Sequence, residues 1–193
     1  VYPLPIAMAD PGAQAYSSVV SATLSIPRTQ TDTNTPVQEN TDRSSIIDSD
    51  MELPELEKKW KDPQDLTNKE ELLLRMTLAA YTAGDTAKAR EYAQHLLGNI
   101  DAAANWNRNN CIHIANIVLG KTALSEGNLA AAKQFLIAAA PADGSPQLIS
   151  FGPNMALAQD LLARGEKEVV IEYLRRCGEF WERDLTEGWI RQI

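Results

Sequence analysis

The sequence contains few of the residues that build metal sites and disulfide frameworks. Its 193 residues include two cysteines and two histidines, too few thiols for a disulfide framework or a four-cysteine metal site. Cys111 and Cys177 lie in apolar segments of helical period, which favours two small buried hydrophobic residues; a disulfide between them is the alternative. His95 and His113 have no carboxylate at metal-ligand spacing, so we expect them to be solvated or packed. We predict no metal and no cofactor.

Long apolar runs and an excess of positive charge are also missing. No run approaches the roughly 20 apolar residues that a membrane-spanning helix needs. The chain has 18 Lys and Arg against 26 Asp and Glu, a net charge of -8, and its pI is about 4.8. Nucleic acids and anionic membranes select for clusters of basic residues. We therefore expect neither a nucleic-acid partner nor a membrane span.

Sequence motifs of catalysis are absent. The chain has no Gly-x-Ser-x-Gly turn, no His-Glu-x-x-His motif and no glycine-rich phosphate loop. Some carboxylates are close in sequence, such as Asp160 and Glu166, but they fall on predicted helix surfaces, where such residues are usually solvated. The sequence favours a protein that is not an enzyme and has no catalytic residues.

The chain divides into two unlike parts. Residues 1–50 hold 13 of the 22 Ser and Thr and five of the ten prolines, and their two arginines and six carboxylates give a net charge of -4. Such a segment cannot build a hydrophobic core alone. We assign residues 1–50 to an extended arm and linker, and residues 51–193 to a helical domain. The Ser- and Thr-rich composition is also typical of segments that carry O-linked glycans.

The start of the chain favours export. Its first residue is Val rather than Met, and residues 7–9 read Ala-Met-Ala, the small-x-small pattern that precedes signal-peptide cleavage. We interpret the chain as a processed form with an extracellular or cell-surface location. Periplasmic and cytoplasmic locations are the alternatives.

One stretch of the arm has the period of a β-strand. Within residues 19–27, the apolar side chains of Val20, Ala22, Leu24 and Ile26 alternate with a set that is mostly Ser and Thr, as in a half-buried strand. A lone strand leaves its backbone N–H and C=O groups and its apolar face to water. This predicted strand therefore needs an acceptor.

From about residue 51 the sequence has the period of helices. A short helix is predicted after Pro54, and three helical pairs follow. Their predicted bounds are roughly 68–82 with 86–98, 107–125 with 129–140, and 154–164 with 167–180. Each pair turns at a glycine, Gly84, Gly127 or Gly165, which suits the positive φ of a helix C-cap. The three hinges form an internal repeat.

Prolines and aromatic residues mark the end of the domain. Pro153 suits the first turn of the last helical pair, while Pro141 and Pro146 bracket a loop before it. Residues around Trp181, Trp189 and Ile190 predict a short C-terminal capping helix. We expect the tryptophans to pack in the caps and the core rather than to bind a ligand; they are Trp60, Trp106, Trp181 and Trp189.

The helical pairs resemble tetratricopeptide repeats. Residues 119–141, LGKTALSEGNLAAAKQFLIAAAP, carry a Leu-Gly pair before the hinge, and Ala132 and Phe135 after it. Residues 78–97 and 157–174 have a small or β-branched residue at the position of Ala132 and an aromatic residue at the position of Phe135. The hinges are 43 and 38 residues apart, whereas family repeats have about 34 residues. The resemblance, which extends to uncharacterised bacterial members, implies an all-α, TPR-like α-solenoid of about three hairpins. The extended N-terminal arm would add a short β-strand.

In the register of that family, the first helices of the pairs line an apolar groove. The predicted groove residues are Leu74, Leu78, Tyr81, Ile114, Ile117, Leu124, Met155 and Leu162. Family members that hold a peptide carboxylate use Lys, Arg and Asn at such positions, and this set is absent. Apolar patches above a few hundred Å² seldom stay open on a monomer, so we expect the groove to be covered.

Our leading hypothesis is a secreted, non-enzymatic subunit that self-assembles by docking its arm onto neighbouring copies. Burying each large apolar side chain of the strand gives about 1.5–3 kcal/mol, which barely offsets about 1–2 kcal/mol of ordering per backbone residue. Docking therefore needs backbone pairing as well, most simply with the equivalent strand of another copy. Such a heterologous contact builds a filament if its rotation does not close. The alternatives are a TPR-like adaptor that binds a peptide or partner protein in the groove, an arm that covers the groove of its own chain, and an arm that is a disordered tether.

Overall fold

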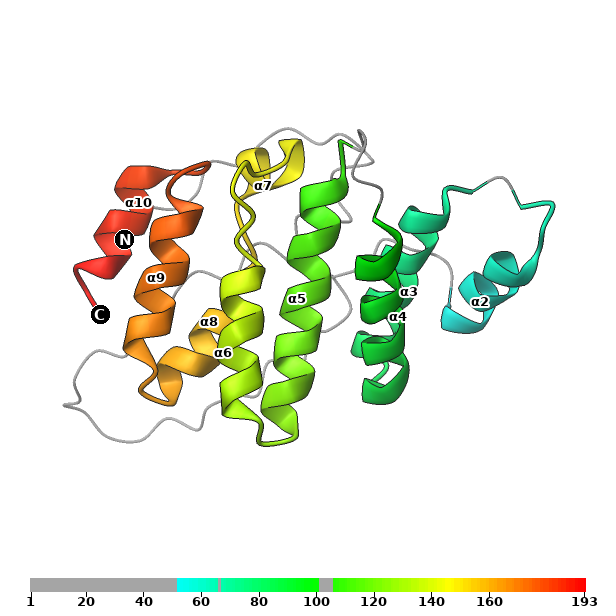
Figure 1. The fold of residues 1–193 in the computed structure, drawn as a ribbon, viewed down its shortest axis with the longest axis horizontal. Coiled ribbons are helices and arrows are strands. Elements are labelled where there is room, and N and C mark those ends of the chain that lie inside the picture. The colour runs from blue at the N-terminus through cyan, green and yellow to red at the C-terminus, as the bar shows by residue number, and fades with distance from the viewer. Residues whose placement is uncertain (1–51, 66, 101–105) are drawn as a thin grey trace, which may run out of the picture.

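The computed structural model describes residues 52–65, 67–100 and 106–193, and these residues form nine helices and no strand (Figure 1). The all-α class predicted for this part of the chain is confirmed. The helices are α2 (Leu53–Lys61), α3 (Lys69–Thr82), α4 (Thr86–Asn99), α5 (Arg108–Ser125), α6 (Leu129–Ala138), α7 (Pro146–Phe151), α8 (Ala156–Ala163), α9 (Lys167–Cys177) and α10 (Arg183–Ile190). The predicted strand lies outside the described residues.

Short turns join six of the helices into three pairs, α3–α4, α5–α6 and α8–α9. Each turn contains the predicted hinge glycine in the left-handed region, with φ of 76° at Gly84, 78° at Gly127 and 84° at Gly165, where residues with a Cβ are strained. Asp85 and Asn128 then cap the next helix by accepting a backbone N–H three residues further on. The local sequence therefore determines where each pair turns.

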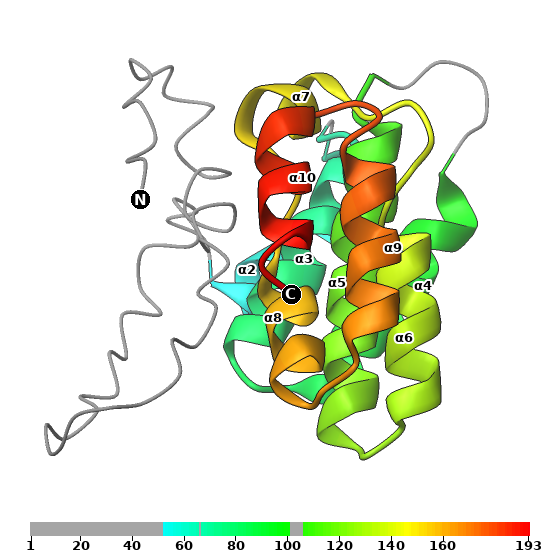
Figure 2. The ribbon, with the colours of Figure 1, turned by 90° about the vertical axis from the view of Figure 1, so that its left-hand side faces the viewer.

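The three pairs pack side by side in chain order. α4 contacts α5, and α6 contacts both α8 and α9. The first helices of the pairs also contact one another, α3 with α5 and α5 with α8. Turned by 90°, the molecule shows α4, α6 and α9 in one layer and α3, α5 and α8 in the other (Figure 2). Every helix pair thus buries apolar surface against its neighbour.

Phe135 of α6 joins the two large core clusters. It packs against the cluster of the first pair and α5, and against the cluster that α8 and α9 share with α5 and α6. Gly120 of α5 makes this close approach possible, since a Cβ there would lie 3.2 Å from the Phe135 Cβ and would overlap the Leu157 Cδ2. Gly120 belongs to the Leu-Gly pair noted in the sequence.

At the N-terminal end of the row, α2 covers the first pair. Leu56 is fully buried, and the Glu57 carboxylate accepts hydrogen bonds from Lys88 Nζ at 2.7 Å and the Tyr92 hydroxyl at 2.6 Å, both of α4. The Lys69 ammonium lies 5.4 Å from the centre of the Trp60 ring and donates to the last carbonyls of α2. The short helix predicted after Pro54 is confirmed, although it begins at Leu53.

At the C-terminal end, α10 covers the last pair, as predicted. The rings of Trp181 and Trp189 lie 5.9 Å apart, and with Ile190 they pack against the core cluster of α8 and α9. The row of helices is therefore covered at both ends.

The connection between α6 and α8 differs from the prediction. Residues around Pro146 were expected to form a loop, but Pro146 begins α7, and the Ser145 hydroxyl caps this helix by accepting the Leu148 N–H. Pro153 was expected in the first turn of the last pair, yet α8 begins three residues later. Gly152, with φ of 82°, ends α7 and turns the chain, and this delays the start of α8.

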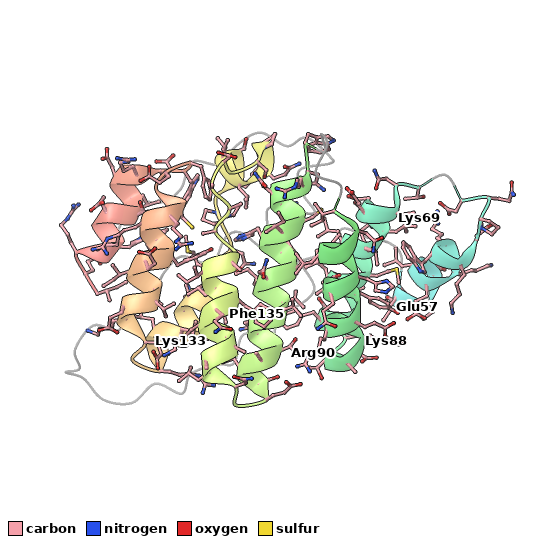
Figure 3. All side chains as sticks on the ribbon, viewed as in Figure 1. Glu57, Lys69, Lys88, Arg90, Lys133 and Phe135 are labelled. Carbon is pink, nitrogen blue, oxygen red and sulfur yellow. The ribbon has the colours of Figure 1, made fainter. Side chains whose placement is uncertain are left out.

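Two ion pairs link successive helix pairs through basic residues at equivalent positions. Arg90 and Lys133 each lie six residues after a hinge glycine, and they bond to Glu126 and Glu166, which adjoin the hinge glycine of the following pair. Figure 3 shows both basic side chains along the lower side of the row. These groups are partly solvated, so each ion pair contributes little stability, typically about 0–1 kcal/mol. The equivalent position of the last pair is Ile171, so the basic residue is not repeated there.

We predict opposite effects of alanine at two helical glycines. Gly120→Ala should lower the free energy of unfolding by about 1–2 kcal/mol, because overpacking a core outweighs the gain in helix propensity. Gly98→Ala is the matched control, since a Cβ there meets nothing within 4 Å, and it should raise stability by about 0.5 kcal/mol. Urea unfolding measures both. Equal effects at the two sites would contradict the packing role of Gly120.

Candidate interaction surface

The structure brings the predicted groove residues together on α3, α5 and α8 but buries most of them. Adjacent members of this set of helices contact each other. Five of the eight residues are at most 5% exposed and belong to the core clusters; they are Leu74, Ile114, Ile117, Leu124 and Met155. These side chains therefore hold the helix pairs together and offer little surface to a ligand.

The remaining groove residues form a mixed surface. Leu78 and Leu162 are half-buried, and Tyr81 is 36% exposed. On the same helices, Lys121 of α5 forms an ion pair with Asp160 of α8. We call these five residues the α3–α5–α8 face. It offers an aromatic ring and aliphatic edges beside a charged pair, rather than the continuous apolar floor that the sequence predicted.

Two larger exposed apolar side chains lie elsewhere. Trp106, which precedes α5, is 68% exposed, and Ile149 of α7 is 53% exposed. The expectation that all four tryptophans pack inside is therefore wrong for Trp106. It holds for Trp60, Trp181 and Trp189, which pack against the core. The local sequence does not distinguish a packed tryptophan from an exposed one, because both kinds lie near helix ends.

A buried set of polar groups links α5, α9 and the segment before α8. The His113 ring lies between two backbone groups, with Nδ1 2.6 Å from the Ala139 carbonyl oxygen and Nε2 accepting the Asn154 N–H at 2.8 Å. The Tyr173 hydroxyl donates to the Asn154 carbonyl at 2.9 Å. We call His113, Asn154 and Tyr173 the polar knot.

The polar knot is built for structure rather than for chemistry. Burial lowers the pKa of His113 to about 4, although the bond to the Ala139 carbonyl opposes this shift, and burial raises the pKa of Tyr173 well above its usual value. Both side chains are therefore neutral near pH 7, and less than 2% of either is exposed. The sequence identified His113 as a candidate for packing but gave no sign of its partner Asn154, which is 41 residues away.

The two cysteines are free and buried. Cys111 belongs to the core cluster of the first pair and Cys177 to that of the last pair, so the disulfide considered as an alternative is not formed. Burial raises the pKa of both thiols to about 12. Because the thiolate is the reactive form, these cysteines are poor nucleophiles near neutral pH.

Other shifted carboxylates also hold the fold together. Hydrogen bonds lower the pKa of Glu57, chiefly that from Lys88, and that of Asp65, chiefly that from Thr67. Within residues 52–65, 67–100 and 106–193, no three His, Cys, Asp or Glu side chains are placed to hold a metal ion. In the same part of the chain, no helix is both long and apolar enough to cross a membrane.

Comparison of the chain with models of known protein families, with curated proteins and with solved structures gives no match.

We predict that Tyr173→Phe lowers the free energy of unfolding by about 1–3 kcal/mol, because it leaves the buried Asn154 carbonyl without its hydroxyl donor. Tyr81→Phe removes the same atom from a partly exposed side chain and should change stability by less than about 0.5 kcal/mol. Urea unfolding of the two variants makes the comparison. A Tyr173→Phe variant as stable as the parent would show that the hydroxyl contributes nothing to the knot.

Proposed function

We propose that the protein is a non-enzymatic interaction subunit, in which a TPR-like solenoid carries an N-terminal arm that docks onto neighbouring copies. The observation that carries this proposal is the all-helical body. Its described residues contain no strand and therefore offer no sheet edge. A strand formed by residues 19–27 would need backbone partners from another source, and the equivalent segment of a second copy is the simplest one.

The arrangement of the pairs supports the solenoid. Each pair contacts the next through both of its helices, and Arg90 and Lys133, each six residues after a hinge glycine, form ion pairs with the pair that follows. In solenoids, stability comes from such contacts between neighbouring repeats. The hinge glycines and the small residues that follow them are the sequence features of this packing.

The covered ends of the row favour the arm as the linking element. α2 and α10 pack over the first and last pairs, so copies that stacked end to end would first have to displace these helices. A contact between the arm of one copy and the body or arm of the next leaves both caps in place. It is heterologous, and it extends into a filament if its rotation does not close.

We place such an assembly outside the cell, with the Ser- and Thr-rich arm as a carrier of O-linked glycans. The composition of residues 1–50 supports this placement, because few basic residues accompany many hydroxyl groups. The two free thiols do not argue against it, since both are buried and unreactive.

A second candidate function is an adaptor that binds a partner protein on the α3–α5–α8 face. The exposed ring of Tyr81 favours it, because tyrosine is enriched at protein interfaces. In this function the arm is a linker. Removing residues 1–45 would leave a monodisperse domain that still binds its partner, whereas in the assembly such a deletion abolishes polymers.

If the subunits assemble through the predicted strand of residues 19–27, negative charges on its apolar face should prevent polymer formation. The full chain with Val20→Asp, Leu24→Asp and Ile26→Asp should remain monomeric in light scattering at concentrations where the parent forms polymers, because buried carboxylates in an apolar interface are strongly unfavourable.

The matched control places the same three charges on the opposite face, as Ser21→Asp, Thr23→Asp and Ser25→Asp. These carboxylates stay in water, so polymers should persist at an onset concentration within about tenfold of the parent's. A parent chain that stays monomeric at high concentration contradicts self-assembly. Equal loss of polymers in both variants contradicts the predicted orientation of the strand.

A further inference from the structure

The connection between α6 and α8 buries mostly backbone and small side chains. Besides the His113 bonds, the Asn109 amide donates to the Gly144 carbonyl and the Tyr173 hydroxyl to the Asn154 carbonyl. We call residues 139–154 the α7 connector, because they include α7. Both views place α7 at the upper edge of the molecule, above the neighbouring helix pairs (Figures 1 and 2), and α7 packs extensively against none of the other helices. Leu148 is its one fully buried large apolar side chain among the described residues. Segments with so little buried apolar surface open more readily than a helical core.

Hydrogen bonds and two aromatic rings attach the connector instead. Its two ends meet at His113, whose ring nitrogens bond to Ala139 and Asn154. A Cβ at Gly144 would lie 2.9 Å from the Phe180 ring, and a Cβ at Gly152 would lie 2.5 Å from the Trp181 ring. The backbone of the connector therefore covers these two aromatic rings.

Both bonds of His113 require the neutral ring. Nδ1 must carry a hydrogen to donate to the Ala139 carbonyl, and Nε2 must be bare to accept the Asn154 N–H. Protonation adds a hydrogen at Nε2, and this hydrogen then points at the Asn154 N–H, which is itself a donor. The charge would also be buried without a counter-ion, since no charged group contributes to the shifted pKa of His113. A charged ring thus breaks one of the two bonds that attach Asn154, leaving the bond from the Tyr173 hydroxyl, and it favours its own exposure to water.

We propose that His113 is an acid-sensitive latch, and that its protonation releases the α7 connector while the stacked helix pairs remain folded. Release uncovers the ring faces of Phe180 and Trp181 and so creates an apolar surface that the closed molecule does not have. The latch acts within one subunit and does not depend on assembly through the arm.

The other buried titratable side chains of α5 and α9 do not compete with this response. Cys111 on α5, and Tyr173 and Cys177 on α9, have pKa values raised by burial to about 12 or above the ordinary tyrosine value, so all three stay neutral in acid. Asp143, the carboxylate of the connector itself, is exposed at the surface.

The sign and size of the response follow from linkage. A histidine has a pKa near 6.5 in water, and His113 has a pKa of about 4 in the closed state, so the open state binds the proton more tightly. The closed state keeps its full stability above about pH 6.5 and loses it as the pH falls towards 4. The opening equilibrium constant should therefore rise about 30-fold between roughly pH 7.5 and pH 5.

Hydrogen exchange of the full chain tests the latch. Protection factors of the amides in residues 146–154, corrected for intrinsic exchange, should fall about 30-fold between about pH 7.5 and pH 5. Low concentrations of urea should change this exchange little, since local opening exposes little surface. Protection that does not depend on pH would overturn the proposal. So would a urea dependence equal to that of the α3 amides, which would indicate global unfolding.

Two variants assign the response to one ring. His113→Gln keeps a donor and an acceptor but does not titrate, so the acid-induced loss of protection should shrink to less than about threefold. His95→Gln, the matched control on the exposed surface of α4, should retain the full loss. A loss that persists in His113→Gln, or disappears in His95→Gln, contradicts the assignment.

Nitrogen chemical shifts of the parent's histidine rings test the same proposal without a substitution, even if His113→Gln fails to fold. At pH 5 the His113 ring should still be neutral and protonated at Nδ1 in the closed state. A charged His113 ring in the folded protein at pH 5 would overturn the latch.

Discussion

The burial of α5 between the first and last helix pairs is the constraint on which the rest of the structure depends. This helix is buried along nearly its whole length, because helices of the first and last pairs pack against it as well as its own partner α6. Gly120 lets it approach α6 and α8 closely enough for Phe135 to join the two main core clusters. The stack is therefore continuous from α2 to α10.

This packing also explains why the perturbed side chains do not form a reactive site. His113, Tyr173 and the two cysteines owe their shifted pKa values to burial, and Glu57 and Asp65 owe theirs to hydrogen bonds that attach helices or turns. Strongly perturbed groups often indicate catalysis. Here each one lies in the core or within a structural contact.

The sequence predicted the helices well because their signals are local. Gly84, Gly127 and Gly165 mark the turns through their backbone freedom, and Asp85 and Asn128 mark the helix starts through their side chains. α7 was missed because a six-residue helix is too short for a periodic pattern, although the Ser145-Pro146 pair is a helix-start signal. The predicted arm strand lies outside the described residues and stays a prediction.

The sequence by itself determined the all-helical body, its three hinged pairs and its two covering helices, because each depends on residues within a few positions of one another. The tertiary structure decided which apolar positions are exposed: it buries Ile114 and Ile117 and leaves Trp106 in solvent. It also decided that His113 meets Asn154. Such contacts join residues tens of positions apart, and they depend on how the helix pairs stack, which periodicity and capping do not encode.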